Sequence, residues 1–288
     1  MLHEFLETAI SRQLSNKAAC LVIQNKKSIT LHCGDSRPDT LYDLASLTKI
    51  ICTTLLTAQA ICEASLSLHE CPWPGWPGVS VGNVLNHTAG LPPWRPLHSL
   101  AEVYDIKPLH PPSGKTLYSD VGFIALGALL RERRGRGLED FAHLLGTKEL
   151  QFGGPEGVED PRCHALGGVT GHAGVFGTLA GVGEAAQFFL QSLTNPSSPL
   201  ELMLRYFALF PGERALGFDR PSPGGSTGEA LSAGAVGHLG FTGCSLWVDP
   251  LHQGLYVLLL RRLDQGERQE ELKNFRREFH RRAAIFFR

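Results

Sequence analysis

One apolar run, residues 50–62, constrains this chain more than any other stretch. It reads Ile, Ile, Cys, Thr, Thr, Leu, Leu, Thr, Ala, Gln, Ala, Ile, Cys. A helix that is apolar on nearly every side must be buried on nearly every side. The rest of the chain must therefore surround a central helix, and 288 residues are enough to form such a core.

A serine and a lysine precede this run in the sequence Ser46-Leu47-Thr48-Lys49. Residues three apart on a helix are neighbours, so the hydroxyl and the ammonium can meet. The serine would also lie at the positive end of the helix dipole, which favours a developing alkoxide. Such a pair is typical of acyl-transferring enzymes with a serine nucleophile. Because about one Ser-x-x-Lys is expected by chance in a chain of this length, a capping serine with a solvated lysine is the alternative.

The bulk composition excludes several classes of protein. Apolar residues make up 43% and charged residues 19%, which is typical of a globular chain. The net charge of −1 gives no sign of a nucleic acid or an anionic membrane as partner. We therefore expect a small-molecule or peptide substrate, and the oligomeric state stays open.

The cysteines and the N-terminus bear on metals and location. Seven cysteines are scattered without a Cys-x-x-Cys pair, which argues against a disulfide framework and against zinc. We expect no metal and no cofactor, and cysteines that are buried as small hydrophobes. The N-terminus lacks the features of a signal peptide, and apolar stretches such as 255–260 are too short to span a bilayer. We therefore expect a cytoplasmic protein without a membrane segment.

The two ends of the chain predict one antiparallel sheet flanked by helices. Amphipathic helices are expected over residues 3–16 and 267–287. Runs rich in β-formers and bounded by turn residues predict strands at 18–24, 28–33, 235–242, 245–248 and 255–260. The predicted fold class is α/β of the α+β type, with N- and C-terminal helices packed on the sheet.

The middle of the chain is expected to be a mostly helical insertion. Helices are predicted over residues 81–86, 121–130 and 181–193. The Gly-rich stretch 166–178 is interpreted as a connection whose backbone passes close to a site. His87, beside a helix end, is interpreted as a structural hydrogen-bonding residue. We expect a single catalytic unit over 1–288, with its α/β part at about 1–62 and 205–288 and its helical part at about 63–204.

Two further motifs follow the serine and lysine, namely Tyr118-Ser119-Asp120 and His238-Leu239-Gly240. Together the three resemble the active site of the serine β-lactamase and penicillin-binding-protein superfamily. Within it, the chain is most similar to the class C β-lactamase-related group of D,D-peptidases, esterases and acyltransferases. The stretches 85–92, 166–178 and 240–250 resemble that group too, so the resemblance covers about residues 18–262. It implies a β-lactamase/transpeptidase-like fold.

The resemblance also implies roles for individual residues. Ser46 would be the nucleophile, and Lys49 would help to accept its proton. Tyr118 would act as, or assist, the general base and then protonate the leaving group. The backbone N–H groups of Ser46 and Phe241 would form the oxyanion hole. His238 and Gly240 would line the cleft along an edge strand, where an extended substrate can add.

Two positions depart from the motifs of the group, Asp120 where Asn is frequent and His238 where Lys is frequent. Asp120 is expected near the substrate and close to Lys49 and Tyr118, where it would hold Lys49 as a cation. The alternative is that Asp120 only caps a helix beginning at Val121. If His238 titrates near pH 6.5, anionic substrates should gain over neutral ones as the pH falls.

The function predicted from these residues is that of a serine hydrolase. It would act through a Ser46 acyl-enzyme on an ester, an amide or a D-amino-acid peptide, and acyl transfer is possible. The alternative is a catalytically inactive family member that serves as a ligand-binding or sensor module. A third interpretation is a structural protein with an accidental Ser-x-x-Lys.

Overall fold

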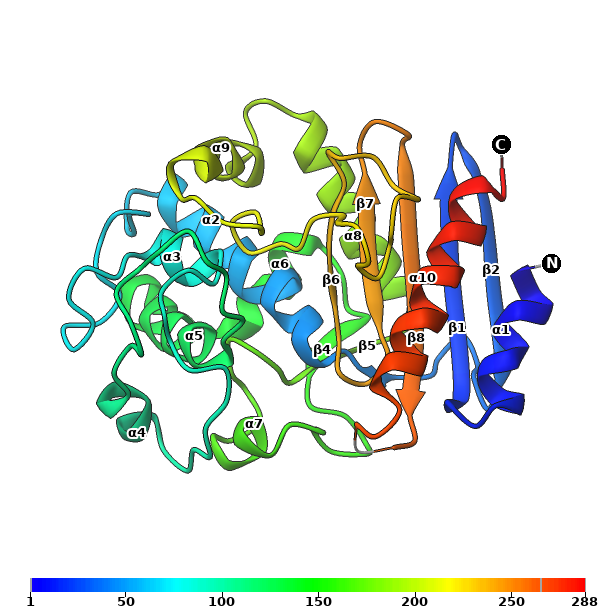
Figure 1. Cartoon of the computed structure of the whole chain (residues 1–288), viewed down its shortest axis with the longest axis horizontal. Coiled ribbons are helices and arrows are strands. Elements are labelled where there is room, and N and C mark those ends of the chain that lie inside the picture. The colour runs from blue at the N-terminus through cyan, green and yellow to red at the C-terminus, as the bar shows by residue number, and fades with distance from the viewer. Residues whose placement is uncertain (1, 265, 288) are drawn as a thin grey trace.

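The protein is organised around a five-stranded antiparallel sheet in the order β2-β1-β8-β7-β6. The computed structural model describes residues 2–264 and 266–287. The strands are β1 (Ser15–Gln24), β2 (Lys27–Gly34), β6 (Val236–Leu239), β7 (Ser245–Asp249) and β8 (Gly254–Arg262). The five predicted strands are therefore confirmed, and β1 beside β8 joins the two ends of the chain (Figure 1).

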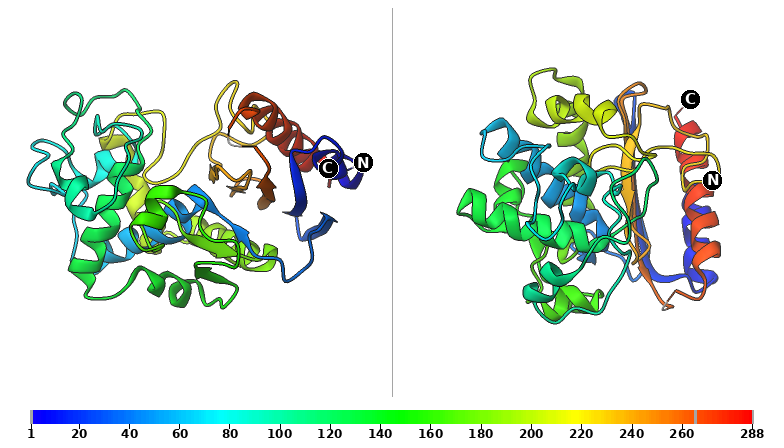
Figure 2. Two further views of the ribbon diagram at one scale, coloured as in Figure 1. Left: turned by 90° about the horizontal axis from the view of Figure 1, so that it is seen from below. Right: turned by 60° about the vertical axis from the view of Figure 1, so that its left-hand side comes forward.

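Helices cover both faces of this sheet. The helices α1 (Leu2–Ser11) and α10 (Gln269–Ile285) pack on one face, and α8 (Leu179–Thr194) packs on the other (Figure 2, right). The apolar stripe predicted on the C-terminal helix is buried at Leu272, Phe275, Phe279 and Ala283. The predicted extent of the first helix is wrong at its end, because pairing with β8 draws the chain into β1 from Ser15.

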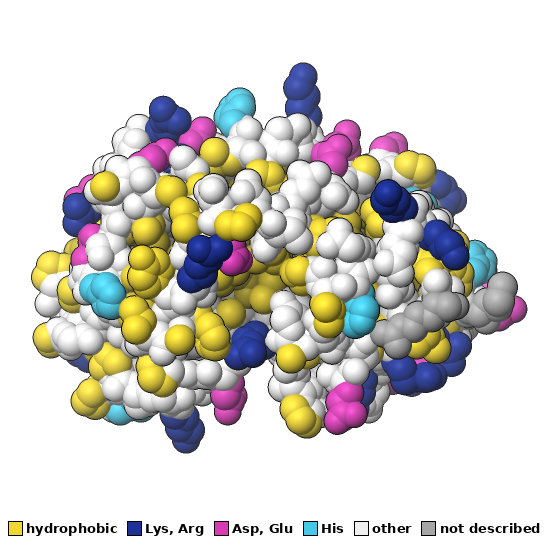
Figure 3. Space-filling view, turned by 90° about the horizontal axis from the view of Figure 1, so that it is seen from above, with side chains coloured by type: hydrophobic (Ala, Val, Ile, Leu, Met, Phe, Trp, Pro, Cys, Tyr) yellow, Lys and Arg dark blue, Asp and Glu magenta, His cyan; other side chains and the backbone are white. Residues whose placement is uncertain are grey.

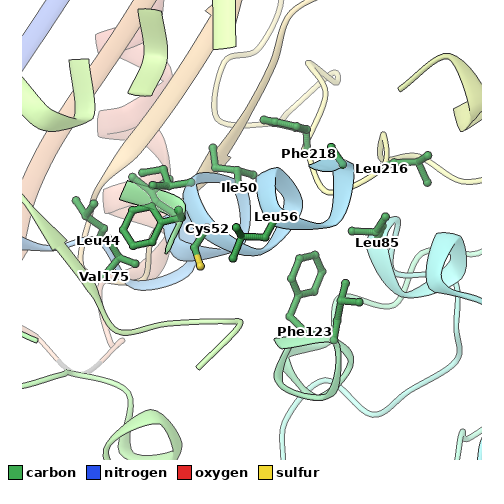
Figure 4. Close-up of a cluster of buried hydrophobic side chains, with 14 of the residues drawn as sticks. Leu44, Ile50, Cys52, Leu56, Leu85, Phe123, Val175, Leu216 and Phe218 are labelled. Atoms are coloured by element: carbon green, nitrogen blue, oxygen red, sulfur yellow. The ribbon is translucent and has the colours of Figure 1, made fainter. Parts of the chain in front are cut away.

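The central helix is a composite of three parts. A 3-10 turn, Ala45–Leu47, is followed by a π-helical segment, Lys49–Thr54, and then by α2 (Leu55–Cys62). Side chains from several elements surround it, among them Leu85, Phe123, Val175 and Phe218 (Figure 4). The apolar run thus forms the buried axis that its composition predicted, while π-helical turns are rare and often occur at functional sites.

The middle of the chain is mostly helical, as predicted. Its helices are α3 (Val81–Leu85), α4 (Leu100–Asp105), α5 (Asp120–Arg134), α6 (Phe141–Leu145), α7 (Pro161–Ala165) and α9 (Pro199–Arg205), with 3-10 turns at Leu138–Asp140 and Tyr206–Leu209. The helices predicted at 81–86, 121–130 and 181–193 are confirmed as α3, α5 and α8.

A second, three-stranded sheet was not predicted. It consists of β3 (Tyr42–Asp43), β5 (Val175–Gly177) and β4 (Leu150–Phe152) in the order β3-β5-β4. The interpretation of 166–178 as a mere connection is therefore wrong at its end, where β5 lies. Strands of two or three residues are too short to show a period of two, so the sequence carries no signal for them.

One segment passes the test of length and composition for a membrane span. Of the described residues, Ala45–Cys62 alone does so, with a mean hydropathy of 1.4, and 78% of it is buried inside the protein. Five of the seven cysteines are buried as expected, but Cys62 and Cys71 are exposed. On the face shown in Figure 3, acidic and basic side chains are interspersed around hydrophobic ones.

Candidate active site

Ser46 lies in a strained turn directly after β3. The preceding residue, Ala45, has a φ of 46°, which is uncommon for a residue other than glycine. The side chain of Asp43 stabilises this turn because its Oδ1 accepts the Ala45 N–H at 2.8 Å. The Leu44 N–H donates to the Val175 carbonyl at 3.0 Å. The unpredicted small sheet therefore fixes the backbone that carries the serine.

Lys49 lies beneath the serine with its side chain fully buried, at 0% exposure. Its Nζ donates to Ser46 Oγ at 2.8 Å, to Asp120 Oδ1 at 2.7 Å and to the His172 carbonyl at 3.4 Å. The contact between serine and lysine predicted from their spacing is thus present. The alternative of a solvated lysine is wrong.

Asp120 joins Lys49 to a second cation. Its Oδ2 accepts a hydrogen bond from Arg162 Nη2 at 2.5 Å. The helix α5 begins at Asp120 itself, and its N-cap residue, Ser119, makes no side-chain capping hydrogen bond within the described part of the chain. The alternative that Asp120 only caps a helix is therefore wrong, because its carboxylate bridges two cations, and the expected contact with Lys49 is present.

The charges of this pair reinforce each other. Burial by itself would lower the pKa of Lys49, but the carboxylate of Asp120 and the neighbouring Tyr118 outweigh it, so the pKa is raised. Burial by itself would raise the pKa of Asp120, but Lys49, His172 and Arg162 outweigh it, so that pKa is lowered. At neutral pH the site thus holds a lysine ammonium and an aspartate carboxylate.

A second carboxylate, Asp160, completes this network. It caps α7 by accepting the N–H groups of Arg162 and Cys163, each at 2.9 Å. The Arg162 guanidinium lies 2.6 Å from Asp160 Oδ2, and His172 Nε2 lies 3.2 Å from Oδ1. Sequence reasoning missed all three side chains of this network. The one signal was Asp160-Pro161, a typical helix start, which says nothing of where Arg162 points.

Tyr118 is held by His87 on both sides of its backbone. The Leu117 N–H donates to the His87 carbonyl at 2.8 Å, and the Ser119 N–H donates to His87 Nδ1 at 3.1 Å. The two rings lie against each other with centroids 4.4 Å apart. Burial lowers the pKa of His87 well below its usual value, so Nδ1 is free to accept. The interpretation of His87 as a structural hydrogen-bonding residue is confirmed.

Positive charge surrounds the Tyr118 ring. Lys49 Nζ and Arg214 Cζ each lie 5.0 Å from its centroid. The His238 ring lies 5.9 Å away. Two cations therefore lie against the Tyr118 ring, which favours them through its π-electrons.

His238 lies in β6, the edge strand of the main sheet. Its Nδ1 is 2.8 Å from the Leu239 carbonyl, which can only accept, so the proton is on Nδ1. Its Nε2 is buried and has no hydrogen-bond partner among the residues that the structure describes. Burial, together with Arg214 and Lys49, holds the pKa of His238 well below its usual value. The expectation that His238 titrates near pH 6.5 is therefore wrong.

A tight turn follows β6 and carries Phe241. The Gly240 N–H donates to the Cys244 carbonyl at 2.8 Å, and the Gly243 N–H donates to the Gly240 carbonyl at 3.1 Å. Gly240 packs so closely on the serine turn that a Cβ there would lie 2.7 Å from the Leu44 carbonyl oxygen. Thr242 Oγ1 donates to the Asp43 carbonyl at 2.7 Å. The turn is thus fastened to the backbone before Ser46.

These elements enclose a cleft of about 460 Å³, which suits a small molecule or part of a peptide. Every predicted site residue except Lys49 lines it, namely Ser46, Tyr118, Asp120, His238, Gly240 and Phe241. Lys49 lies behind Ser46, as its full burial requires. Sequence reasoning missed Trp94, Arg162, Arg214 and Arg276, which also line the cleft.

One group of side chains elsewhere has the spacing of metal ligands. Among the described residues, His3, Glu7 and Cys33 place potential ligand atoms within 4.8 Å of one another. They lie on α1 and β2, at the opposite edge of the main sheet from β6. Both His3 and Glu7 are exposed, and the group has no contact with the cleft.

The fold agrees with comparisons to known proteins. The family model described as Beta-lactamase matches residues 7–280. The chain therefore belongs to the β-lactamase family, whose members include hydrolases with a serine nucleophile. A search of curated proteins found no match.

Several solved structures share the fold at low sequence identity. A β-lactamase from Mycobacterium bovis is 22% identical with a TM-score of 0.70, over 96% of this chain and 99% of that one. EstCE1, described as a hydrolase with promiscuous acyltransferase activity, is 16% identical with a TM-score of 0.74, over 97% of both chains. SurE, solved with D-Leu, is 20% identical with a TM-score of 0.73, over 96% of this chain and 74% of that one.

Proposed function

We propose that the protein is a serine hydrolase of the class C β-lactamase-related group that works through an acyl-enzyme on Ser46. The observation that carries the proposal is the 2.8 Å hydrogen bond from Lys49 Nζ to Ser46 Oγ at the wall of the cleft. A nucleophile in contact with a buried, ion-paired lysine is the arrangement that activates serine in acyl transfer.

The proposed reaction has two steps. Ser46 Oγ attacks the carbonyl carbon and loses its proton to a base, and the tetrahedral intermediate then expels the leaving group, which takes that proton. Water hydrolyses the resulting ester of Ser46, or an alcohol or amine accepts the acyl group instead. The backbone N–H groups of Ser46 and Phe241 would bind the oxyanion in both steps.

Tyr118 is the better candidate for the base. Lys49 has a raised pKa and an ion pair with Asp120, so it stays an ammonium and cannot take a proton at neutral pH. As a cation it donates a hydrogen bond to Ser46 Oγ and stabilises the alkoxide as it forms. Tyr118 lines the same cleft as Ser46, and the cations Lys49 and Arg214 lie 5.0 Å from the centroid of its ring.

Three classes of substrate are proposed, in order of preference. Esters are the first, because EstCE1 shares the fold and is a hydrolase with acyltransferase activity. D-amino-acid peptides are the second, because SurE shares the fold and was solved with D-Leu. Amides, including β-lactams, are the third. A neutral His238 offers no positive charge to a substrate carboxylate.

Covalent labelling tests the proposal. The protein is treated with a fluorophosphonate and with a fluorescent penicillin, and the adduct is located by mass spectrometry. We expect an adduct on Ser46 from at least one probe and none with Ser46→Ala, whose fold is kept because the substitution removes one hydroxyl. Hydrolysis of chromogenic esters, nitrocefin and D-alanyl peptides then ranks the substrates. An unlabelled, folded protein that still binds these ligands would favour the inactive binding module.

A further inference from the structure

A buried arginine on the C-terminal helix holds the turn after β6. Arg276 lies on α10, is 3% exposed and lines the cleft. Its Nε donates to the Gly243 carbonyl at 3.1 Å. Its Nη2 donates to the Cys244 carbonyl at 3.3 Å and makes a shorter hydrogen bond to the Gly240 carbonyl. One guanidinium thus binds three carbonyls of a single turn.

The charge of Arg276 is not balanced by a carboxylate of the described residues. Among residues 2–264 and 266–287, no acidic side chain lies within ion-pair distance of Arg276, although the arginines 162, 214 and 262 each have an acidic partner. Burial lowers the pKa of Arg276 to about 10, so it is still charged at neutral pH. Burying a charge without a counter-ion is costly. Here the compensation comes from the three carbonyl dipoles, all of which belong to the turn that carries Phe241.

The geometry of the peptide bond links this contact to the cleft. The Gly240 carbonyl and the Phe241 N–H belong to the same peptide unit, which is planar and trans. When the carbonyl points at Arg276, the N–H must point the opposite way. A cation on the carbonyl oxygen also polarises the unit and strengthens its N–H as a donor. Arg276, together with the Gly243 N–H on the same carbonyl, therefore affects both the direction and the strength of the Phe241 N–H.

We propose that Arg276 is a positioning residue that orients and polarises the Gly240–Phe241 peptide for oxyanion binding. The inference rests on the proposed function, which gives this N–H its role. The opposite side of the turn is fixed by Thr242 on the Asp43 carbonyl and by Gly240 against Leu44. Arg276 thus clamps the oxyanion donor against the backbone that leads to Ser46.

The kinetic test compares Arg276→Lys and Arg276→Gln with the wild type. Removing one oxyanion donor costs about 100- to 1,000-fold in turnover, so misaligning one should cost about 10- to 100-fold in kcat for an ester, with KM changed less than threefold. Affinity for an arylboronic acid, whose tetrahedral Ser46 adduct places an oxygen in the oxyanion hole, should fall in parallel. Arg276→Lys should lose less activity than Arg276→Gln, because lysine keeps the positive charge but lacks the several planar N–H donors of the guanidinium.

Arg277→Gln is the matched control. Arg277 is the next residue on α10, and it binds the Gly224 and Gly225 carbonyls at 2.6 and 3.0 Å, outside the cleft. It should lose comparable loop contacts yet keep kcat and boronate affinity. If the Arg276 variants lose only thermal stability, with kcat per folded molecule and boronate affinity unchanged, the inference is overturned. It is also overturned if Arg277→Gln shows the same losses.

An NMR measurement separates this inference from the proposed function. The protein is labelled with ¹⁵N-phenylalanine, and the Phe241 amide is assigned by its loss in Phe241→Leu. In folded Arg276→Lys, the Phe241 amide proton should shift upfield because its peptide is less polarised. An unshifted amide would overturn the inference even if the enzyme is active. If the Phe241 amide shifts between wild type and Arg276→Lys but no probe acylates the wild type, Arg276 still orients the turn, and the proposed hydrolase function is refuted.

Discussion

Lys49 and Asp120 form a buried ion pair, with Nζ 2.7 Å from Oδ1 and side-chain exposures of 0% and 14%. The pair joins the central helix to α5 across the region behind Ser46. Because each charge stabilises the other, neither residue can change its protonation state without affecting its partner. The pair therefore fixes which residues in the site can exchange a proton near neutral pH.

Asp120→Asn should lower the pH at which acylation reaches half its maximum. The substitution removes the anion that raises the pKa of Lys49, while the burial that lowers this pKa remains. Lys49 can then become neutral and accept the Ser46 proton at a lower pH. The check is a pH–rate profile of acylation for wild type and variant between pH 5 and 10. Superimposable profiles would contradict the conclusion that Asp120 keeps Lys49 in its charged form.

The same variant should lose stability, because it leaves Lys49 and Arg162 with less negative charge nearby. Breaking a buried ion pair typically costs about 3–5 kcal/mol, so we expect a loss of about 3 kcal/mol in the free energy of unfolding at pH 7. Asp140→Asn is a matched control. Asp140 Oδ2 lies 2.6 Å from Arg134 Nη2, and neither residue lines the cleft. This control should leave the pH–rate profile unchanged.

His238 should not favour anionic over neutral substrates by becoming protonated as the pH falls. Since its pKa is held well below the usual value, the ratio of kcat/KM for a matched anionic and neutral ester should stay flat from pH 5 to 8. His238→Lys should raise that ratio by roughly tenfold, the effect of about 1.4 kcal/mol. A wild-type ratio that rises on acidification would show that His238 does become charged.

Gly240→Ala should reduce catalysis through a steric effect on the turn. The added Cβ would lie 2.7 Å from the Leu44 carbonyl oxygen, which is backbone and cannot move away cheaply. The turn should shift from the serine, and kcat should fall about 100-fold, as for loss of an oxyanion donor. Gly114→Ala is the control, because its Cβ would meet nothing closer than Pro211 Cβ at 3.8 Å. Equal activity of both variants would refute this reading of the turn.

His87→Ala should weaken the support of Tyr118. It leaves the Ser119 N–H buried without its acceptor, which costs about 1–3 kcal/mol. We expect a lower thermal midpoint and a fall in kcat at all pH values from 6 to 9, because His87 is neutral throughout. His98→Ala, at an exposed position, should change neither quantity. If kcat of His87→Ala instead falls only above or only below one pH in this range, His87 exchanges protons in the reaction.

The main sheet and its flanking helices were predictable because their signals are local and long. The strands β1, β7 and β8 are runs of β-forming residues bounded by turns, and the helix α10 has apolar residues at helical spacing. The small sheet of β3, β5 and β4 was not predictable, since each of its strands has only two or three residues. Its existence depends on contacts between segments far apart in the chain.

The sequence by itself determined the buried central helix, the contact of Ser46 with Lys49 and the order of the three motifs. Those features depend on helical spacing and on residue type, which can be read along one segment. The resemblance implied that Asp120 holds Lys49 as a cation, but only the tertiary structure shows this ion pair and decided the charge of His238. Lys49 is an ammonium because Asp120 Oδ1 lies 2.7 Å from its Nζ, although the two residues are 71 positions apart in the sequence. His238 is neutral because the fold buries it near Arg214 and Lys49. Charge depends on burial and on neighbours in space, and neither is encoded in a local pattern.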